Sequence, residues 1–175
     1  MAITKIQSES LNLADTYAFT GTVTGAGGVN TPSFKAYLSS NQTLSSGANT
    51  KIAFNTEDYD IGSCYDNSTN YRFEPSTSGK YFIYSKISFN NSAGNDYNAT
   101  VILIMKNGSE IMRMTVDPHD SYQHNQTHNY VAGVFSMNGT SDYIEVFGQP
   151  HTGGGTPSAD SGQNNTYFGA YKIIE

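Results

Sequence analysis

Cysteine, tryptophan and positive charge are scarce in this chain. Its 175 residues include one Cys and no Trp, and 15 Asp and Glu outnumber 9 Lys and Arg, which gives a net charge of -6. The single Cys64 excludes an internal disulfide, and we expect it to be reduced and partly buried, with a reactive thiol as the alternative. Because Lys and Arg are scattered singly, we expect no nucleic-acid partner.

Long apolar segments and good helix formers are also scarce. No stretch has the length needed to span a bilayer, so we expect no membrane insertion. The first residues, 1–5, lead into polar sequence rather than an apolar run. This pattern predicts no signal peptide and therefore synthesis in a cytoplasm.

The abundant residues favour strands and turns. The sequence contains 17 Gly and 13 Tyr together with many Asn, Ser and Thr. Asn107-Gly108 and Asn138-Gly139 each predict a tight hairpin turn. The predicted strands span 33–38, 51–55, 70–74, 80–90, 99–107, 110–116, 129–138, 142–149 and 166–174. Nine strands with turns between them predict an all-β fold, an antiparallel sandwich or jelly roll of two sheets.

The first 32 residues differ from the rest in how apolar residues and glycines are distributed along the sequence. Residues 1–24 carry isolated apolar side chains in polar surroundings, and residues 25–32 form a Gly-rich linker that ends in a proline. We therefore expect an N-terminal docking arm and linker over 1–32 and a globular head over 33–175. The residues expected to dock the arm are Ile3, Ile6, Leu11, Leu13, Tyr17 and Phe19.

Two of the predicted strands have apolar residues on both faces. Residues 79–89, GKYFIYSKISF, send Tyr81 and Ile83 to one face and Phe82 and Tyr84 to the other, and residues 101–105 are apolar without a break. In an antiparallel sheet the second face needs a cover, for which a neighbouring copy of the chain is the economical choice. The alternative is a wide strand in the middle of a thick sandwich.

From Ser33 onwards the chain resembles the C1q-like, tumour-necrosis-factor-like jelly roll. The matching segments are 34–37, 52–55, 73–83, 101–108, 131–146 and 167–171. The most characteristic is 73–83, in which Pro75 and Gly79 lie on either side of a turn that leads into the long aromatic strand. The resemblance implies a jelly roll of ten strands that assembles as a tight homotrimer around a threefold axis. The interface residues that we expect on this basis are Phe82, Tyr84, Ile102, Ile104, Tyr167 and Tyr171.

Residues 3–8 and 18–23 resemble segments that precede C1q-like heads in structural proteins of marine tailed phages, cyanophages in particular. This resemblance implies a non-enzymatic virion protein, either a capsid decoration or head fibre or a short tail fibre, that binds capsid or tail proteins through its arm. The alternative is an adhesin module that binds a host glycan or protein through tip loops, with Tyr122 and His151 as candidate contacts. A polysaccharide depolymerase is a third hypothesis, although no catalytic motif is present.

No cofactor is expected, but two groups of residues have metal-ligand chemistry. His124 and His128 have the spacing of a metal pair only if their segment is helical, whereas its composition predicts a loop. Asp58 and Asp60, with Glu57 and Asp66, form an acidic stretch that suits calcium, which some members of the resembled family bind near the trimer apex. The alternative for both groups is a solvated loop.

Overall fold

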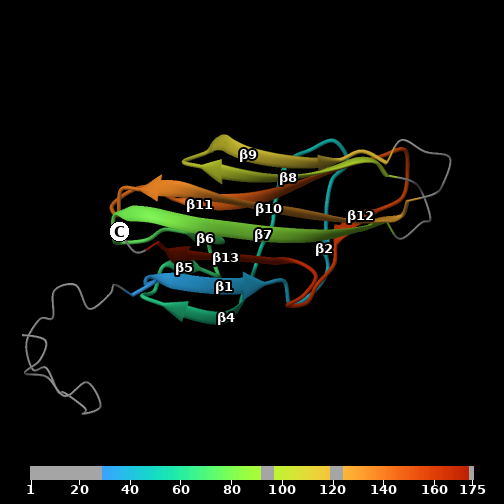
Figure 1. Cartoon of the computed structure of the whole chain (residues 1–175). Helices are drawn as coiled ribbons and strands as arrows, with labels where there is room; N and C mark the ends of the chain where they lie inside the picture. Colours follow the sequence, from blue (N-terminus) through green and yellow to red (C-terminus); the bar gives the residue numbers. More distant parts are fainter. Residues whose placement is uncertain (1–28, 92–96, 119–123, 174–175) are drawn as a thin grey trace, which may run out of the picture.

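The computed structural model describes residues 29–91, 97–118 and 124–173, and within these ranges the chain forms strands and no helix (Figure 1). The strands are β1 Ser33–Tyr37, β2 Gln42–Thr43, β3 Thr50–Lys51, β4 Thr56–Ile61, β5 Tyr65–Asp66, β6 Arg72–Phe73, β7 Gly79–Asn91, β8 Tyr97–Lys106, β9 Ser109–Val116, β10 Gln126–Met137, β11 Ile144–Thr152, β12 Pro157–Ala159 and β13 Tyr167–Lys172. The predicted arm and its six docking residues lie outside the described ranges.

The strands form two antiparallel sheets that stack as a sandwich (Figure 1). The seven-stranded sheet has the order β2-β12-β7-β13-β1-β4, and β10 pairs with the other edge of β7. The six-stranded sheet has the order β5-β6-β11-β8-β9, and β3 also pairs with β11. The predicted all-β, two-sheet antiparallel class is therefore confirmed.

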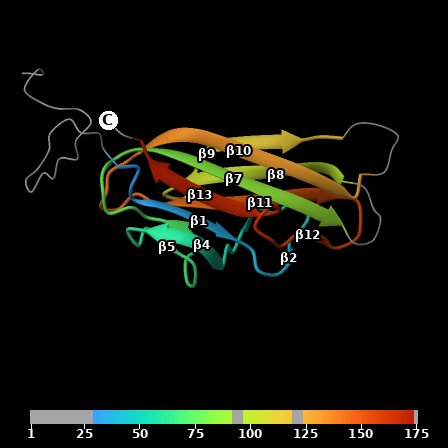
Figure 2. The ribbon, with the colours of Figure 1, turned by 60° about the horizontal axis from the view of Figure 1, so that its bottom comes forward.

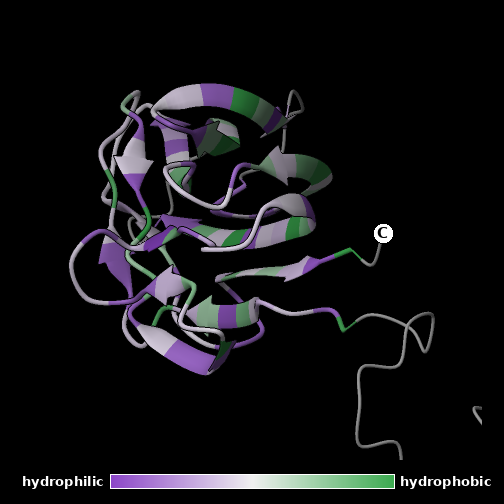
Figure 3. Ribbon diagram, turned by 90° about the vertical axis from the view of Figure 1, so that its left-hand side faces the viewer, coloured by the Kyte–Doolittle hydropathy of each residue, from purple (hydrophilic) through white to green (hydrophobic). Residues whose placement is uncertain are grey.

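The core lies between the sheets and is rich in aromatic rings. The inward set of β7, which includes Tyr81, Ile83 and Ile87, is fully buried, as strand alternation predicts. Phe34 of β1 stacks on Tyr65 with 4.5 Å between ring centroids and meets Phe168 edge-on at 4.9 Å. Figure 3 shows hydrophobic and hydrophilic residues alternating along single strands.

Strand β8 does not expose a second apolar face. Ile102 and Ile104 are fully buried in the core between the sheets, and Val101 and Leu103, on alternate positions, are also buried within the single chain. Leu103 lies between Phe147 of β11 and Arg113 of β9, whose long side chains stand beside it. The prediction that a neighbouring copy covers Ile102 and Ile104 is therefore wrong, because β8 is an inner strand that its own chain covers.

Several predicted strand boundaries also differ from the structure. The predicted strand 51–55 is reduced to the short β3, and the acidic stretch that we expected as a loop forms β4 at the edge of the seven-stranded sheet. The Gly-rich segment 151–165 includes the end of β11 and all of β12. These segments take their conformation from pairing with distant strands, which local composition does not encode.

The two Asn-Gly pairs behave differently. Asn107 and Gly108 both have positive φ angles, 51° and 79°, and join β8 to β9 in the predicted tight turn. Gly139 alone has a positive φ angle in the second pair, and the connection from β10 to β11 runs over 138–143. The second prediction of a tight hairpin is therefore wrong.

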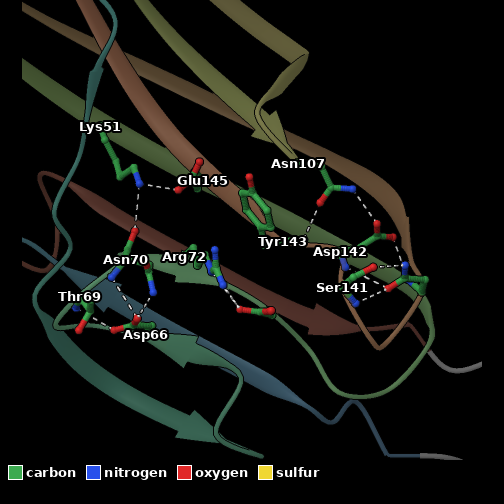
Figure 4. A network of polar contacts seen from close by, with 12 residues as sticks. Lys51, Asp66, Thr69, Asn70, Arg72, Asn107, Ser141, Asp142, Tyr143 and Glu145 are labelled. Atoms are coloured by element: carbon green, nitrogen blue, oxygen red, sulfur yellow. Dashed lines mark hydrogen bonds and ion pairs between the residues drawn. The ribbon is translucent and has the colours of Figure 1, made fainter.

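A network centred on Asp142 ties these two connections together (Figure 4). The Asp142 carboxylate accepts hydrogen bonds from Asn107 Nδ2 at 2.8 Å and from the Asn138 backbone N–H at 2.9 Å, and pairs with Lys106 Nζ at 2.9 Å. Asn107 Oδ1 in turn accepts from the Tyr143 backbone N–H at 2.9 Å. The hydrogen bonds from Lys106 and Asn107 lower the pKa of Asp142.

Asp66 organises the loop between β5 and β6 in a similar way. Its carboxylate accepts backbone N–H bonds from Ser68 at 3.0 Å, Thr69 at 2.9 Å and Asn70 at 3.0 Å. These bonds, with that of Thr69 the largest contribution, hold the pKa of Asp66 well below its usual range. The ionised form is therefore the one that the folded loop stabilises.

This lowered pKa gives a pH-dependent prediction. Asp66 stabilises the fold above its unfolded pKa of about 3.9, and this stabilisation is lost as the pH falls further towards the folded pKa. We expect Asp66→Asn to cost about 1 kcal/mol in the free energy of unfolding at pH 7 and clearly less at pH 2, closer to the folded pKa, measured by urea denaturation. Glu57→Gln is the control, because burial raises the pKa of Glu57 and its replacement should not destabilise the fold at pH 7. Equal losses for Asp66→Asn at both pH values would contradict the prediction.

The two ends of the sandwich are formed by different parts of the chain. Ser33, where β1 begins, pairs with Tyr171 near the end of β13, so the described chain starts and finishes at one end, here called the terminal end (Figure 2). The opposite end, here called the distal end, carries the end of β7 at Asn91, the start of β10 at Gln126 and the segment after β11.

Candidate functional site

The outer face of the seven-stranded sheet, which points away from the core, carries a broad set of large side chains. Pairing registers place them in three rows across five strands, because residues opposite one another in antiparallel strands point to the same face. The set, here called the aromatic face, comprises Tyr59, Ile61, Phe82, Tyr84, Tyr130, Val134, Tyr167 and Tyr171. It collects two residues from each of four strands, β4, β7, β10 and β13, and β1 lies among these strands.

The rings of this face touch one another but remain partly uncovered. Phe82 lies 5.4 Å from Tyr171 and 6.0 Å from Tyr84 between ring centroids, and Tyr84 lies 6.2 Å from Tyr167. The exposed fractions are 53% for Ile61, 51% for Val134, 48% for Tyr130 and 41% for Tyr59. A contiguous surface of this kind on a folded domain is a mark of an interaction site.

Gly169 of β13 makes room for Tyr84 at the centre of the face. A Cβ atom at residue 169 would stand 2.5 Å from Cζ and Oη of Tyr84 and 3.0 Å from the backbone oxygen of Phe34. The Tyr84 ring therefore lies across the strand only because residue 169 has no side chain.

We expect Gly169→Ala to displace the Tyr84 ring and to lower the free energy of unfolding by about 1 to 2 kcal/mol, because the backbone of β1 cannot move away from the new methyl group. Urea denaturation measures the loss. Gly153→Ala is the matched control, since a Cβ atom there has nothing within 4 Å. The same stability for both variants would show that the ring and strand accommodate the methyl group.

Two phenols of the aromatic face, those of Tyr84 and Tyr167, have a raised pKa. Burial raises the pKa of Tyr84, and the hydroxyl of Tyr59 beside it raises the pKa further. The pKa of Tyr167 is raised by burial and by Tyr130. Lys35, between them, pairs with Asp58 at 2.7 Å. The face therefore offers apolar area with neutral hydroxyl groups, which suits association with a protein surface rather than acid or base chemistry.

Four of the six residues predicted for the subunit interface lie on this face, and two do not. Phe82 and Tyr84 from β7 and Tyr167 and Tyr171 from β13 stand together on it, whereas Ile102 and Ile104 belong to the core. Whether the face meets another copy stays a prediction. Sequence reasoning missed Tyr59, Ile61, Tyr130 and Val134, although strand alternation from Val131 places Tyr130 outward.

The candidate metal ligands are not brought together. Asp58 pairs with Lys35 and accepts from Gln163 Nε2, whereas Asp60 accepts the backbone N–H groups of Cys64 at 3.0 Å and Tyr65 at 3.1 Å. His128 lies in β10 beside Ser88, and His124 precedes that strand, so the helical spacing does not apply. In 29–91, 97–118 and 124–173 no three His, Cys, Asp or Glu side chains group as metal ligands do.

The remaining candidates are spread out. Cys64 is buried, its Sγ lies 3.2 Å from Asp60 Oδ1, and burial followed by the hydrogen bond to Asp60 raises the pKa of the thiol. It is therefore a protonated thiol and not an activated nucleophile. His151 lies in β11 at the distal end, half-buried, and Tyr122 falls outside the described residues. Within those residues no helix is long and apolar enough to cross a membrane.

Comparisons with known proteins bear on the fold. No family model matches the chain, and no curated protein matches it. Among solved structures, it is similar to Eiger TNF from S. frugiperda, with a TM-score of 0.60 and 10% identity over 81% of this chain and 91% of that one. It is also similar to murine APRIL, with a TM-score of 0.57 and 16% identity over 81% of this chain and 98% of that one. The chain has a TNF-like jelly-roll fold, as its sequence predicted.

Proposed function

We propose that this protein is a non-enzymatic structural component of a phage virion, a homotrimer whose arm docks on the particle and whose head is displayed. The observation that carries the proposal is the aromatic face, a broad set of aromatic and aliphatic side chains that the chain leaves partly exposed. The resemblance of the head to C1q-like and TNF-like domains supports the trimer, and the resemblance of the arm to segments of marine phage proteins supports the virion.

The energetics favour association through the aromatic face. Burial of roughly 600 to 800 Å² of apolar surface per subunit contributes on the order of 15 to 20 kcal/mol at about 25 cal/mol per Å². The entropy of association costs about 4 to 15 kcal/mol, so a surplus remains. Because the side chains of the face stand on hydrogen-bonded strands of one sheet, little further backbone ordering is needed on binding.

The position of the two chain ends is compatible with a head that projects from the particle. The first described residues and the end of β13 lie at the terminal end, so an arm that docks there leaves the distal end pointing away from the particle (Figures 1 and 2). Under this proposal the docking residues are Ile3, Ile6, Leu11, Leu13, Tyr17 and Phe19, and the protein is located in the virion. Copy number separates the two versions, since hundreds per particle fit capsid decoration and a few trimers fit a tail or vertex fibre.

The solution mass tests the proposal most directly. Light scattering should give a stable mass of three times 19.0 kDa, with and without a chelator. A monomer would overturn the trimer and the function based on it. A trimer that dissociates in chelator would instead show that a metal holds the subunits.

The second candidate is an adhesin that binds a host glycan through its distal end. The polar character of that end favours it, in contrast with the apolar surface nearer the terminal end. A glycan array probed with the wild type and with Tyr122→Ala and His151→Ala tests these two predicted contacts, and an array without binding would count against this function.

A further inference from the structure

A carboxylate at the distal end is surrounded by side-chain amides. Asp160 follows β12 directly, and its Oδ1 accepts from Asn41 Nδ2 at 3.2 Å. Its Oδ2 accepts from Asn90 Nδ2 and from Gln126 Nε2, both at 3.3 Å. The three donors come from three separate parts of the chain, the segment before β2, the end of β7 and the start of β10. The four residues are here called the distal cluster.

The donors around Asp160 differ from those around five other carboxylates. Asp58, Asp142 and Glu145 each face a lysine, at 2.7, 2.9 and 2.5 Å. Asp60 and Asp66 accept mainly from backbone N–H groups. Among the described residues Asp160 has amide donors and no such cation. Its contacts of 3.2 to 3.3 Å are also longer than the usual 2.9 to 3.0 Å for N–H···O bonds. Hydroxyl groups of a ligand can therefore replace the amide donors of Asp160 with little loss of hydrogen-bond energy.

The distal cluster belongs to a longer polar row. Strand registers place Gln126 opposite Asn90, Asn90 opposite Ser158, and Ser158 opposite Thr43. These four side chains stand in line across β10, β7, β12 and β2, and the exposed His128 follows Gln126 on the same face of β10. Amides both donate and accept, and a carboxylate accepts at two oxygens, so the row matches neighbouring hydroxyl groups that each donate and accept.

We propose that the distal cluster binds a neutral carbohydrate, with Asp160 accepting from two sugar hydroxyl groups and the amides of Asn41, Asn90 and Gln126 donating to sugar oxygens. Neutral sugars fit because the uncompensated carboxylate repels anionic ones. The inference rests on the proposed function in one respect, the display of the distal end away from the particle.

Saturation-transfer NMR on the full chain tests the proposal, with the methyl glycosides of glucose, galactose and mannose and with N-acetylglucosamine as probes, in buffer containing a chelator. We expect transfer to the ring protons of at least one probe. Asp160→Asn and Gln126→Ala should each weaken binding about tenfold, because each removes a hydrogen bond to the sugar. Glu110→Gln, on the opposite sheet, is the control and should bind as the wild type does.

Three results would overturn the proposal: no transfer to any of the four probes, unchanged binding by Asp160→Asn and Gln126→Ala, or binding that appears only when calcium is added. The last would make the cluster a cation site. Thermal unfolding of both variants checks that they fold, and the exposed Gln126 provides the second variant if Asp160→Asn does not. Light scattering and co-sedimentation with particles report on the proposed function separately, so sugar binding by a monomer would leave this inference standing while the trimer falls.

Discussion

Val134→Asp is expected to convert a trimer of this protein into single chains. Val134 is 51% exposed in the isolated chain and lies opposite Phe82 in the register of β10 and β7, at one end of a row of the aromatic face. A carboxylate there is solvated in the monomer but must be buried against rings in a trimer, once per subunit. Burial of an unpaired charge costs several kcal/mol, so three such sites exceed the surplus that association leaves.

The measurement is the mass by light scattering, which should fall from three times 19.0 kDa to 19.0 kDa with an unchanged circular dichroism spectrum. Thr115→Asp is the matched control, because Thr115 is also β-branched and exposed but lies on β9 in the other sheet. It should leave the mass unchanged. A trimeric Val134→Asp would place the subunit contact elsewhere on the molecule.

Deletion of residues 2–24 is expected to abolish attachment to particles and to leave the head intact. The core and the aromatic face are both formed by residues after Ser33, so neither needs the arm. The deleted chain should keep the melting temperature of the full protein and should still have the mass of three of its own shortened chains. Co-sedimentation with purified particles should fall to the level of an unrelated protein.

A double variant, Leu11→Asp with Leu13→Asp, separates apolar docking from arm length. If the arm docks through its apolar side chains, this variant should detach as the deletion does. Particles that still retain the deleted chain would place the docking surface on the head.

Strand alternation predicted the outward residues of β7 but not those of β8. In β7, Phe82 and Tyr84 alternate with core residues, so their place on the outer face follows from the period of a strand. In β8, Ile102 and Leu103 are both apolar, and periodicity alone cannot tell which of them faces the core. The answer depends on Phe147 and Arg113 beside Leu103, which come from other strands.

The rest of the aromatic face depends on strand register, which a single sequence does not specify. Tyr59 lies in a stretch whose acidic residues suggested a loop, and it reaches the face because β4 pairs with β1. Tyr130 and Val134 reach it because β10 pairs with β7 along 12 residue pairs. The distal cluster was missed for the same reason, since Asn41 and Asp160 are 119 residues apart.

The Asp142 network also bears on the chemical lifetime of the protein. An asparagine followed by glycine is prone to deamidation, in which the next backbone nitrogen attacks the side-chain amide carbon and ammonia leaves. At Asn107 both ends of the amide are held, Nδ2 by Asp142 and Oδ1 by the Tyr143 N–H, so the carbon is kept from the Gly108 nitrogen. The contacts that order the turn therefore also slow its chemical ageing.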